Sequence, residues 1–399
     1  TRSTKGASSA ASDGDKRQGY GAEGGMYAGF FKNNDERLND NIELAAVCDN
    51  DPAKKAKVAE DFPGLPFFDN YLDLLESGIV NAIVTTVPHY DHCVMGIAAL
   101  ERGIHLLGEK PAGVYTKDVE RLIETSKKHP ETTFAIFFNQ RTNPLYRRVK
   151  QLMDEKAIGD LQRATWIITT WWRPQGYYNQ SAWRATWGGE GGGVLVNQAP
   201  HQLDLLQWIC GKPEKVYAKL QYGAGRDIVV ENEVNALLDF GNGATGSFIT
   251  CTNDIVGTDR FEIFGTKGKI IVEDSKKLIV KQLTAPEAEL SENMDMQDVM
   301  RLFMGQVNME DYVKVTEEEF VTPQGLQHIS VLNNFADHIV NGEPLLANGE
   351  EGINGVTLAN AMHLSSWLDK EVDYNVDGDL YLAELNKRIA EEGKFEQKK

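Results

Sequence analysis

The stretch NAIVTTVPHYDHCVMGIAALERGIHLLGEKP, residues 81–111, decides the fold class. Its first part, NAIVTTVP (81–88), has the composition of a buried strand. Residues 91–102 have the pattern of a helix, which Gly103 would end. A second strand-like run, IHLLGEKP (104–111), follows directly. A strand, a helix and a strand at such short spacing predict one repeat of a parallel sheet with helices on its faces.

The same alternation continues on both sides of this stretch. IELAAVCD (42–49) is a continuous apolar run that ends in an acid, as expected of a buried parallel strand. A helical pattern follows at 51–62, and residues 116–128 form a further helix before the strand TFAIFF (133–138). We therefore predict an N-terminal doubly wound parallel sheet, which places the chain in the α/β class.

The pattern changes after about residue 155. The segment RATWIITTWW (163–172) alternates in hydropathy, and a glycine-rich turn and a helix follow at 188–210. Six strand-like runs then come close together between residues 215 and 283, and short turns separate some of them. Helices are expected around 295–305, 327–341, 351–369 and 379–391. This second part predicts an α/β domain built on a mostly antiparallel sheet.

Composition and charge exclude several classes of function. The chain has 399 residues, 41% hydrophobic and 25% charged, which suits a globular protein of two domains. A formal net charge of −18 disfavours nucleic acid and anionic membranes as partners, because their phosphates are repelled. No apolar run approaches the roughly 18–20 residues that span a bilayer, and no secretory signal is present. Four scattered cysteines have neither disulfide nor metal spacing, so we expect a cytoplasmic protein without a metal site.

A weak nucleotide-binding motif stands near the N-terminus. Gly19, Gly21 and Gly24 have the spacing G-x-G-x-x-G, which lets a pyrophosphate approach a helix N-terminus. Asp49 ends a predicted strand 25 residues after Gly24, where an acid binds the ribose hydroxyls of NAD and would repel the 2′-phosphate of NADP. The motif should follow an apolar strand, but residues 1–18 are polar and of low complexity. We expect a disordered or atypical segment there and no first strand.

Two further motifs are more specific. The first is Gly108-Glu109-Lys110-Pro111, and the second is GGGVLVNQAPHQLD at 191–204. In this order, with the predicted strands around them, they resemble the Gfo/Idh/MocA family of glucose–fructose oxidoreductase, inositol dehydrogenase and their relatives. The resemblance covers about residues 19–370.

This resemblance implies a fold and a set of site residues. It implies a Rossmann domain over 19–138 and a substrate-binding and oligomerisation domain over 139–395, with a large open sheet and the nicotinamide between the two. The family's catalytic lysine maps onto Lys110 and its catalytic histidine onto His201. The aspartate that usually stands four residues before that histidine maps onto Asn197, which is a departure. A homodimer or homotetramer is also implied.

The residue types at these positions suit the oxidation of a secondary alcohol. A histidine with an ordinary pKa near 6.5 can accept the hydroxyl proton, and a lysine can stabilise the developing charge on the oxygen. If residues 194–210 are helical, Asn197, His201 and Asp204 share a face. Asn197 would then orient the imidazole or bind a substrate hydroxyl. Asp204 would supply a counter-charge or simply stabilise the helix.

Other candidate residues flank the predicted cleft. Besides the three glycines and Asp49, the residues expected to contact the cofactor are Thr86, Pro88, His89, Glu109 and Lys110. The segment WWRPQGYYNQSAWR (171–184) is rich in aromatic and hydrogen-bonding groups, which suit a ring with several hydroxyls, although an aromatic core would account for part of it. The residues expected to contact the substrate are Tyr178, Trp183, Arg184, Asn139 and Arg141.

The sequence thus predicts an NAD-dependent dehydrogenase or reductase, with NADP less favoured, that acts on a hydroxyl or carbonyl of a sugar, polyol or sugar derivative. Two alternatives stay open. One is a non-catalytic regulator of the same fold that senses a sugar or a nucleotide; the absent first strand and Asn197 favour it, whereas Lys110 and His201 argue against it. The other is an NAD-dependent glycoside hydrolase, and such relatives depart from the glycine-rich histidine motif that this chain keeps.

Overall fold

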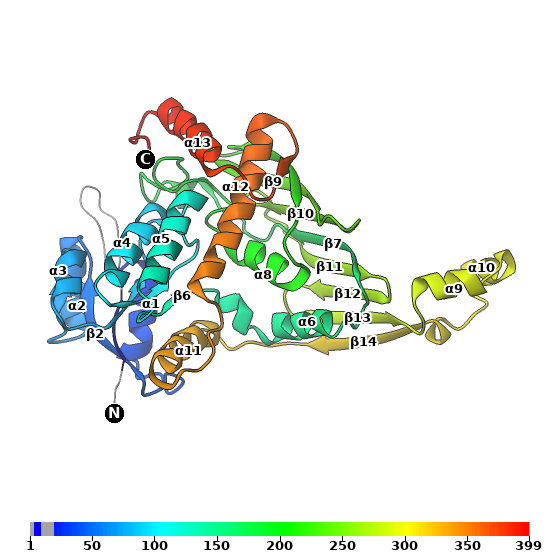
Figure 1. The fold of residues 1–399 in the computed structure, drawn as a ribbon, viewed down its shortest axis with the longest axis horizontal. Helices are drawn as coiled ribbons and strands as arrows, with labels where there is room; N and C mark the ends of the chain where they lie inside the picture. The colour runs from blue at the N-terminus through cyan, green and yellow to red at the C-terminus, as the bar shows by residue number, and fades with distance from the viewer. Residues whose placement is uncertain (1–3, 9–19, 399) are drawn as a thin grey trace.

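The computed structural model describes residues 4–8 and 20–398, which form two sheets with their helices (Figure 1). The first sheet has six parallel strands in the order β3-β2-β1-β4-β5-β6. Its strands are Thr4–Ser8 (β1), Ile42–Cys48 (β2), Phe67–Phe68 (β3), Ala82–Thr85 (β4), His105–Gly108 (β5) and Phe134–Ile136 (β6). This order is that of a dinucleotide-binding Rossmann sheet.

Helices cover both faces of this sheet, as a doubly wound fold requires. They are Ala22–Lys32 (α1), Pro52–Asp61 (α2), Tyr71–Glu76 (α3), His89–Leu100 (α4) and Thr116–Lys128 (α5). Alternate strand residues point to opposite faces: Ile83 and Leu106 pack with α4 and α5, whereas Val84 and Leu107 pack on the other side with Tyr27 of α1. The predicted doubly wound parallel sheet is therefore confirmed.

The first strand was not expected from the sequence. Residues 4–8 pair in parallel with β2 and with β4, so the segment occupies the centre of the sheet. The expectation of a segment without structure is therefore wrong for these five residues. The sequence TKGAS has no apolar run, so periodicity carries no signal; backbone pairing with two neighbouring strands is what holds the segment in place.

The second sheet has nine strands in the order β14-β13-β12-β11-β7-β10-β9-β8-β15. Its strands are Leu161–Ile168 (β7), Lys215–Tyr222 (β8), Glu231–Asp239 (β9), Thr245–Cys251 (β10), Asp259–Gly265 (β11), Gly268–Glu273 (β12), Lys277–Leu283 (β13), Val313–Glu319 (β14) and Val372–Asp373 (β15). Only the pair β7 and β10 is parallel among these strands. The mostly antiparallel sheet is therefore confirmed, with β14 as a strand that the sequence did not predict.

Helices pack on one face of this sheet and connect it to the first. Pro144–Asp154 (α6), Pro200–Cys210 (α8) and Gly352–Leu368 (α12) bury their apolar sides against strand residues such as Trp166 and Phe261. Leu326–Asn341 (α11) returns to the parallel sheet, where Val331 and Phe335 pack beside Tyr27. The remaining helices are Gln175–Tyr178 (α7), Glu287–Asn293 (α9), Met296–Phe303 (α10) and Gly378–Glu392 (α13).

Figure 1 shows α12 between the two sheets, and it shows α9 and α10 projecting beyond β13 and the edge strand β14. Within the described part of the chain, none of the helices is long and apolar enough to cross a membrane.

Candidate active site

Lys110 stands directly after a strand of the parallel sheet. β5 ends at Gly108, which lies beside Thr85 at the end of β4. The carboxyl ends of adjacent parallel strands are where such sheets bind ligands. Thr86 and Pro88 follow β4 at the same edge, and Pro88 precedes the first residue of α4. The predicted cofactor-facing residues Thr86, Pro88 and Lys110 therefore lie at one edge of the sheet.

His92 fastens the loop that carries Lys110. Its Nδ1 lies 2.7 Å from the carbonyl oxygen of Pro111, and its Nε2 lies 2.7 Å from that of Val87. The ring is buried. His92 thus ties the loop after β5 to the segment after β4.

Glu109 is buried next to Lys110. The hydroxyl of Tyr27, on α1, donates a hydrogen bond to its carboxylate. Burial raises the pKa of Glu109 to about 7, although the charge of Lys110 opposes this shift. Tyr27 was not singled out from the sequence, because its position in α1 is distant in the chain from the motif at 108–111.

The second half of the site is a glycine-rich segment, residues 191–199, that leads into α8. Gly191 has a φ of 92°, and a Cβ there would lie 2.3 Å from Val114 Cγ1, so only glycine fits. The backbone N–H of Asn197 donates to Gly193 O at 3.0 Å, and that of Ala199 donates to Val194 O at 2.9 Å. These turns bring the chain to Pro200, the first residue of α8.

The expected helix over 194–210 is therefore wrong at its start. A proline is favoured in the first turn of a helix, since its missing N–H would be unpaired there, and Pro200 begins α8 rather than interrupting it. Asn197 precedes the helix and does not share a helical face with His201 and Asp204.

Lys110 and the glycine-rich segment meet. The Nζ of Lys110 donates to the carbonyl oxygen of Asn197 at 3.3 Å. His201 lies in the first turn of α8, and the positive charge of Lys110 acts on it. Burial, together with the charge of Lys110, lowers the pKa of His201 well below its usual value, so the imidazole is neutral at pH 7. The structure thus brings Lys110, Asn197 and His201 together.

The Nδ1 of His201 is buried and has no hydrogen-bond partner among the residues that the structure describes. A buried polar atom without a partner is unusual in a folded protein and is often found where a side chain has a catalytic role. A neutral imidazole with an unused nitrogen can accept a proton from a hydroxyl group.

Arg141 and Asp204 form a buried ion pair, which agrees with the structural role considered for Asp204 rather than with a counter-charge to His201. Nε of Arg141 lies 2.9 Å and Nη2 lies 2.6 Å from the two carboxylate oxygens of Asp204. Nη1 also contacts Glu351 at 2.7 Å. Because its carboxylate binds Arg141, Asp204 supplies no counter-charge to His201. Arg141 binds both Asp204 and Glu351 and does not face an open cleft.

Asn197 binds a carboxylate that was missed in the sequence. Its side-chain amide donates to Glu190, which is buried. Glu190 also accepts from the backbone N–H of Ala185 at 2.6 Å and lies 3.4 Å from Arg184. His89 contacts the backbone oxygen of the same residue, with its Nδ1 at 3.0 Å. A carboxylate therefore lies beside Asn197, but it belongs to Glu190, just before the glycine-rich segment, and not to residue 197 itself.

The aromatic segment 171–184 contributes differently from the expectation. Tyr178 is buried and its hydroxyl lies 2.7 Å from Thr252 Oγ1, so it belongs to the interior. Its neighbour Tyr177 is partly exposed and accepts a hydrogen bond from Arg184 at 2.6 Å. The guanidinium of Arg184 lies over the rings of Tyr177 and Trp183, at 4.6 and 4.9 Å from their centres. Arg184 and Trp183 thus form one partly exposed cluster with Tyr177.

Asn139 contacts a histidine from the far end of the chain. Its Nδ2 lies 2.8 Å from Nε2 of His328, on α11. Burial lowers the pKa of His328, and the charge of Lys110 adds to this shift. No local motif marks His328, because its position depends on the return of α11 to the first domain.

The nucleotide-binding end is partly described. Gly19 lies outside the described residues, Gly21 precedes α1, and Gly24 is buried in its first turn. Asp49 is buried and accepts hydrogen bonds from the backbone N–H groups of Tyr20 at 2.6 Å and Asp51 at 2.8 Å. Each carboxylate oxygen has a second lone pair for a ribose hydroxyl.

A hollow of about 340 Å³ runs along α1 beside this end. A Cβ at Gly25 or at Gly29 would meet no described atom within 4 Å, so this side of the helix is open. The lining residues are Tyr20, Gly21, Ala22, Gly25, Gly29, Lys32, Lys54, Lys57 and Asp61. A helix N-terminus, an open glycine face and lysine side chains fit the phosphates of a dinucleotide.

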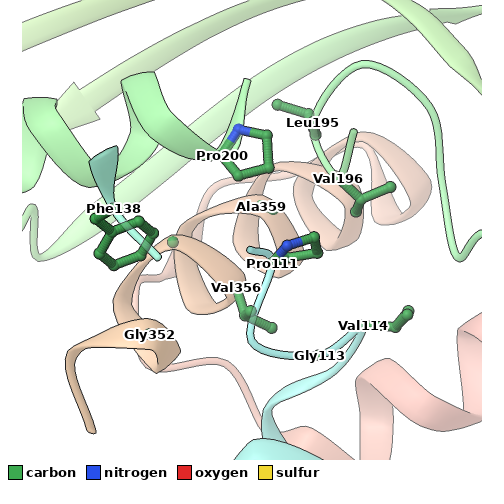
Figure 2. A pocket seen from close by; sticks show the side chains of 11 residues that line it. Pro111, Gly113, Val114, Phe138, Leu195, Val196, Pro200, Gly352, Val356 and Ala359 are labelled. Atoms are coloured by element: carbon green, nitrogen blue, oxygen red, sulfur yellow. The ribbon is translucent and has the colours of Figure 1, made fainter. Parts of the chain in front are cut away.

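A small apolar pocket of about 10 Å³ separates the two halves of the site (Figure 2). Pro111, next to Lys110, and Pro200, next to His201, both line it together with Val356 and Ala359 of α12. Residues next to Lys110 and next to His201 thus line one apolar pocket. Among the described residues, no group of three or more His, Cys, Asp or Glu side chains could hold a metal ion.

Comparison with known proteins agrees with this geometry. A model of the oxidoreductase family with an NAD-binding Rossmann fold matches residues 19–137, and a model of the GFO/IDH/MocA C-terminal domain matches residues 146–271. The chain belongs to the Gfo/Idh/MocA family.

Two curated relatives in this family give the range of similarity. The levoglucosan dehydrogenase of Pseudarthrobacter phenanthrenivorans is 24% identical over 252 residues, which are 56% of this chain and 63% of that protein. The dTDP-3,4-didehydro-2,6-dideoxy-alpha-D-glucose 3-reductase of Actinomadura kijaniata is 25% identical over 321 residues, or 80% and 86% of the two chains. Matches to other relatives span only about half of the length of those proteins: 49% of the putative oxidoreductase YteT of Bacillus subtilis and 50% of an inositol 2-dehydrogenase of Corynebacterium glutamicum.

A solved structure shows the same fold. The WlbA dehydrogenase from Bordetella pertussis, in complex with NADH and UDP-GlcNAcA, superposes with a TM-score of 0.72 at 23% identity and covers 94% of this chain and 100% of that chain. At Asn197, where a departure from the family pattern is expected, the side-chain amide donates a hydrogen bond to Glu190.

Proposed function

We propose that this protein is an NAD(P)-dependent oxidoreductase that interconverts a secondary hydroxyl and a carbonyl of a sugar, polyol or sugar derivative. One observation carries the proposal: Lys110 Nζ reaches the carbonyl oxygen of Asn197, which places it beside the neutral His201 at the junction of the two domains. Membership of the Gfo/Idh/MocA family and the printed activities of the relatives, a levoglucosan dehydrogenase and a sugar 3-reductase, support it.

The two side chains have separate tasks. His201 is neutral and has an unused ring nitrogen, so it accepts the hydroxyl proton during oxidation and returns it during reduction. Lys110 carries a fixed positive charge and stabilises the negative charge that develops on the same oxygen. When bound, the nicotinamide ring supplies the hydride acceptor or donor, and Gly21, Gly24 and Asp49 would hold the dinucleotide.

We propose NAD as the preferred cofactor, because a carboxylate at Asp49 would repel a phosphate on the 2′-oxygen of the ribose. Burial raises the pKa of Asp49, while its hydrogen bonds from Asp51 and Tyr20 favour the charged form. Lys54 and Lys57 lie at the same hollow and could offset that repulsion. A side-by-side measurement of both cofactors is therefore part of the test.

We propose that the substrate is neutral and rich in hydroxyl groups. The Arg184 charge is already balanced by Glu190, and Arg141 is balanced by Asp204 and Glu351, so neither cation is available to bind an acid. Trp183 and Tyr177 offer aromatic faces to a sugar ring, and Asn139 and Gln198 are polar side chains near the same junction.

The proposal can be tested with purified protein. NAD, NADH, NADP and NADPH are titrated while tryptophan fluorescence is recorded, and neutral sugars, polyols and matched sugar acids are then screened for NADH formation at 340 nm. Binding of cofactor with turnover of a neutral polyol supports the proposal. Binding without any turnover favours a sensor, and release of sugar from a glycoside without net NADH favours a glycoside hydrolase; either result would overturn it.

A further inference from the structure

Carboxylates hold the loop that leads to His201 at its beginning and at its end. At the beginning, Glu392 of α13 accepts from the backbone N–H groups of Trp187 at 2.8 Å and Gly188 at 3.2 Å. At the end, Oε1 of Glu231 accepts from those of Gly193 at 2.8 Å and Leu195 at 3.1 Å. The contacts are chemically alike, but only the second lies within a few residues of Asn197 and His201.

Glu231 holds three consecutive residues of this loop. Its side chain binds Gly193 and Leu195, and its backbone oxygen accepts from Val194 N at 3.1 Å. The backbones approach so closely that a Cβ on Gly193 would lie 1.9 Å from the oxygen of Glu231. The loop therefore rests directly on the first residue of β9, and the turn that ends at Ala199 starts from this contact.

His363 of α12 supports Glu231 from behind. Its Nε2 lies 3.1 Å from Oε2 of Glu231, and neither side chain is exposed to solvent. The other ring nitrogen lies 3.1 Å from the hydroxyl of Tyr381. The rings of Trp187 and Trp367 lie against the imidazole, with centres at 5.4 and 5.3 Å. The contact between the two side chains is enclosed on these sides, so Glu231 cannot turn away from the loop without disturbing buried packing.

We propose that Glu231, supported by His363, is a positioning residue that sets the places of Asn197 and His201 opposite Lys110. The inference rests on the proposed function, because it assigns Glu231 a part in that reaction without contact with the reacting atoms. If the two hydrogen bonds to Glu231 are lost, the backbone N–H groups of Gly193 and Leu195 stay buried without an acceptor. We expect the loop to move so that these groups find new partners. The carbonyl oxygen of Asn197, which accepts the hydrogen bond from Lys110, then moves with the loop.

The test compares matched variants at the two ends of the loop. Glu231→Ala and Glu392→Ala each remove one carboxylate that accepts two backbone N–H groups. We expect kcat of Glu231→Ala to fall about 100-fold, the scale for a misplacement of about 1 Å, with the dissociation constant for NADH unchanged. We expect Glu392→Ala to keep kcat within about threefold. Glu231→Gln, which retains an acceptor oxygen, should recover kcat to within about tenfold of the wild type.

A second readout separates positioning from stability. Hydrogen exchange of the peptide that contains residues 193–195 should become faster in Glu231→Ala and stay unchanged in Glu392→Ala. If Glu231→Ala has a lower Tm but its folded fraction turns over at the wild-type kcat, the proposal is overturned. If Glu231→Ala does not fold, Glu231→Met decides, because it keeps the length of the side chain but removes the acceptor oxygen: kcat and exchange equal to those of the wild type overturn the proposal.

The exchange measurement also distinguishes this inference from the function on which it rests. If the wild-type protein turns over no sugar or polyol, the proposed function fails. Unchanged exchange at residues 193–195 in Glu231→Ala would instead show that Glu231 does not place the loop, whatever the activity.

Discussion

The two halves of the active site hold their key residues in different ways. Lys110 follows β5 after a single residue, and the edge of the parallel sheet sets its position. His201 stands at the end of a long glycine-rich loop that is braced by residues from β9, α12 and α13. The first half therefore depends on local strand geometry, whereas the second depends on contacts between distant parts of the chain.

This difference predicts how each half responds to substitution. Around Lys110, changes should act on the chemistry and leave the fold intact. Around His201, changes at remote positions should also disturb the chemistry, because the loop has no strand of its own. The following predictions test the contrast, from the largest expected effect to the smallest.

The first prediction concerns Lys110 and His201 themselves. Lys110→Ala and His201→Ala should each lower kcat by about 10² to 10⁴, the usual contribution of a positioned acid, base or charge. NADH binding, followed by tryptophan fluorescence, should stay within a few fold. Lys117→Ala and His129→Ala, at exposed positions, serve as controls. A variant that loses NADH binding but keeps its turnover per bound complex would contradict these roles.

The second prediction concerns the buried ion pair on the His201 side. Arg141→Ala leaves Asp204 buried and unpaired, so it should lower the free energy of unfolding by about 3–5 kcal/mol. Arg260→Ala breaks an ion pair with Glu273 that is about two-fifths exposed, and it should cost less than about 1 kcal/mol. Urea unfolding measures both. Equal costs would mean that the buried pair gives no more stability than an exposed one.

The third prediction concerns the departure at position 197. Asn197→Asp places a second carboxylate against buried Glu190, which should lower the free energy of unfolding at pH 7 by about 1–3 kcal/mol. The cost should shrink as the pH falls, because one carboxyl group then takes up a proton. The double variant Asn197→Asp, Glu190→Gln should recover most of the loss. No recovery would show that the pair does not act as a unit.

The fourth prediction concerns the effect of the Lys110 charge on the pKa of His201. His201 should titrate below its usual pKa of about 6.5, and Lys110→Met should move that pKa upward, because one of the charges that lower it is gone. Proton NMR of the imidazole measures both values. Since the folded state has the lower pKa, this group costs stability as the pH falls below about 6.5. A midpoint at or above 6.5 in the wild type would contradict the described burial.

The fifth and smallest effect is expected at the nucleotide-binding end. Asp49→Ala should weaken NADH binding by about tenfold, or about 1.4 kcal/mol, and should reduce the preference for NADH over NADPH. Asp51→Ala, on the neighbouring helix start, is the control. An unchanged ratio of the two dissociation constants would show that Asp49 does not select the cofactor.

The sequence predicts the parts of the molecule that depend on local pattern. The buried strands, the antiparallel sheet, Lys110 and His201 all follow from runs of apolar residues or from short motifs. Glu231 and His328 could not be found in this way, because each acts through a contact with a residue that is distant in the sequence. Glu190 is only seven residues from its partner Asn197, but it lies in a loop without helix or strand periodicity, so no pattern marks it. The start of α8 was misplaced because the shared face of Asn197 and His201 requires a helix from residue 194, whereas Pro200 is its first residue.

The helix α12 has a further consequence for how the enzyme tolerates motion. Val356 and Ala359 of this helix line the pocket that Pro111 and Pro200 also line. A later turn of the same helix carries His363, which contacts Glu231. We therefore expect a small sliding of α12 to displace the supports of Lys110 and His201 together. Such a motion would change access to the site more than it changes the separation of the two groups.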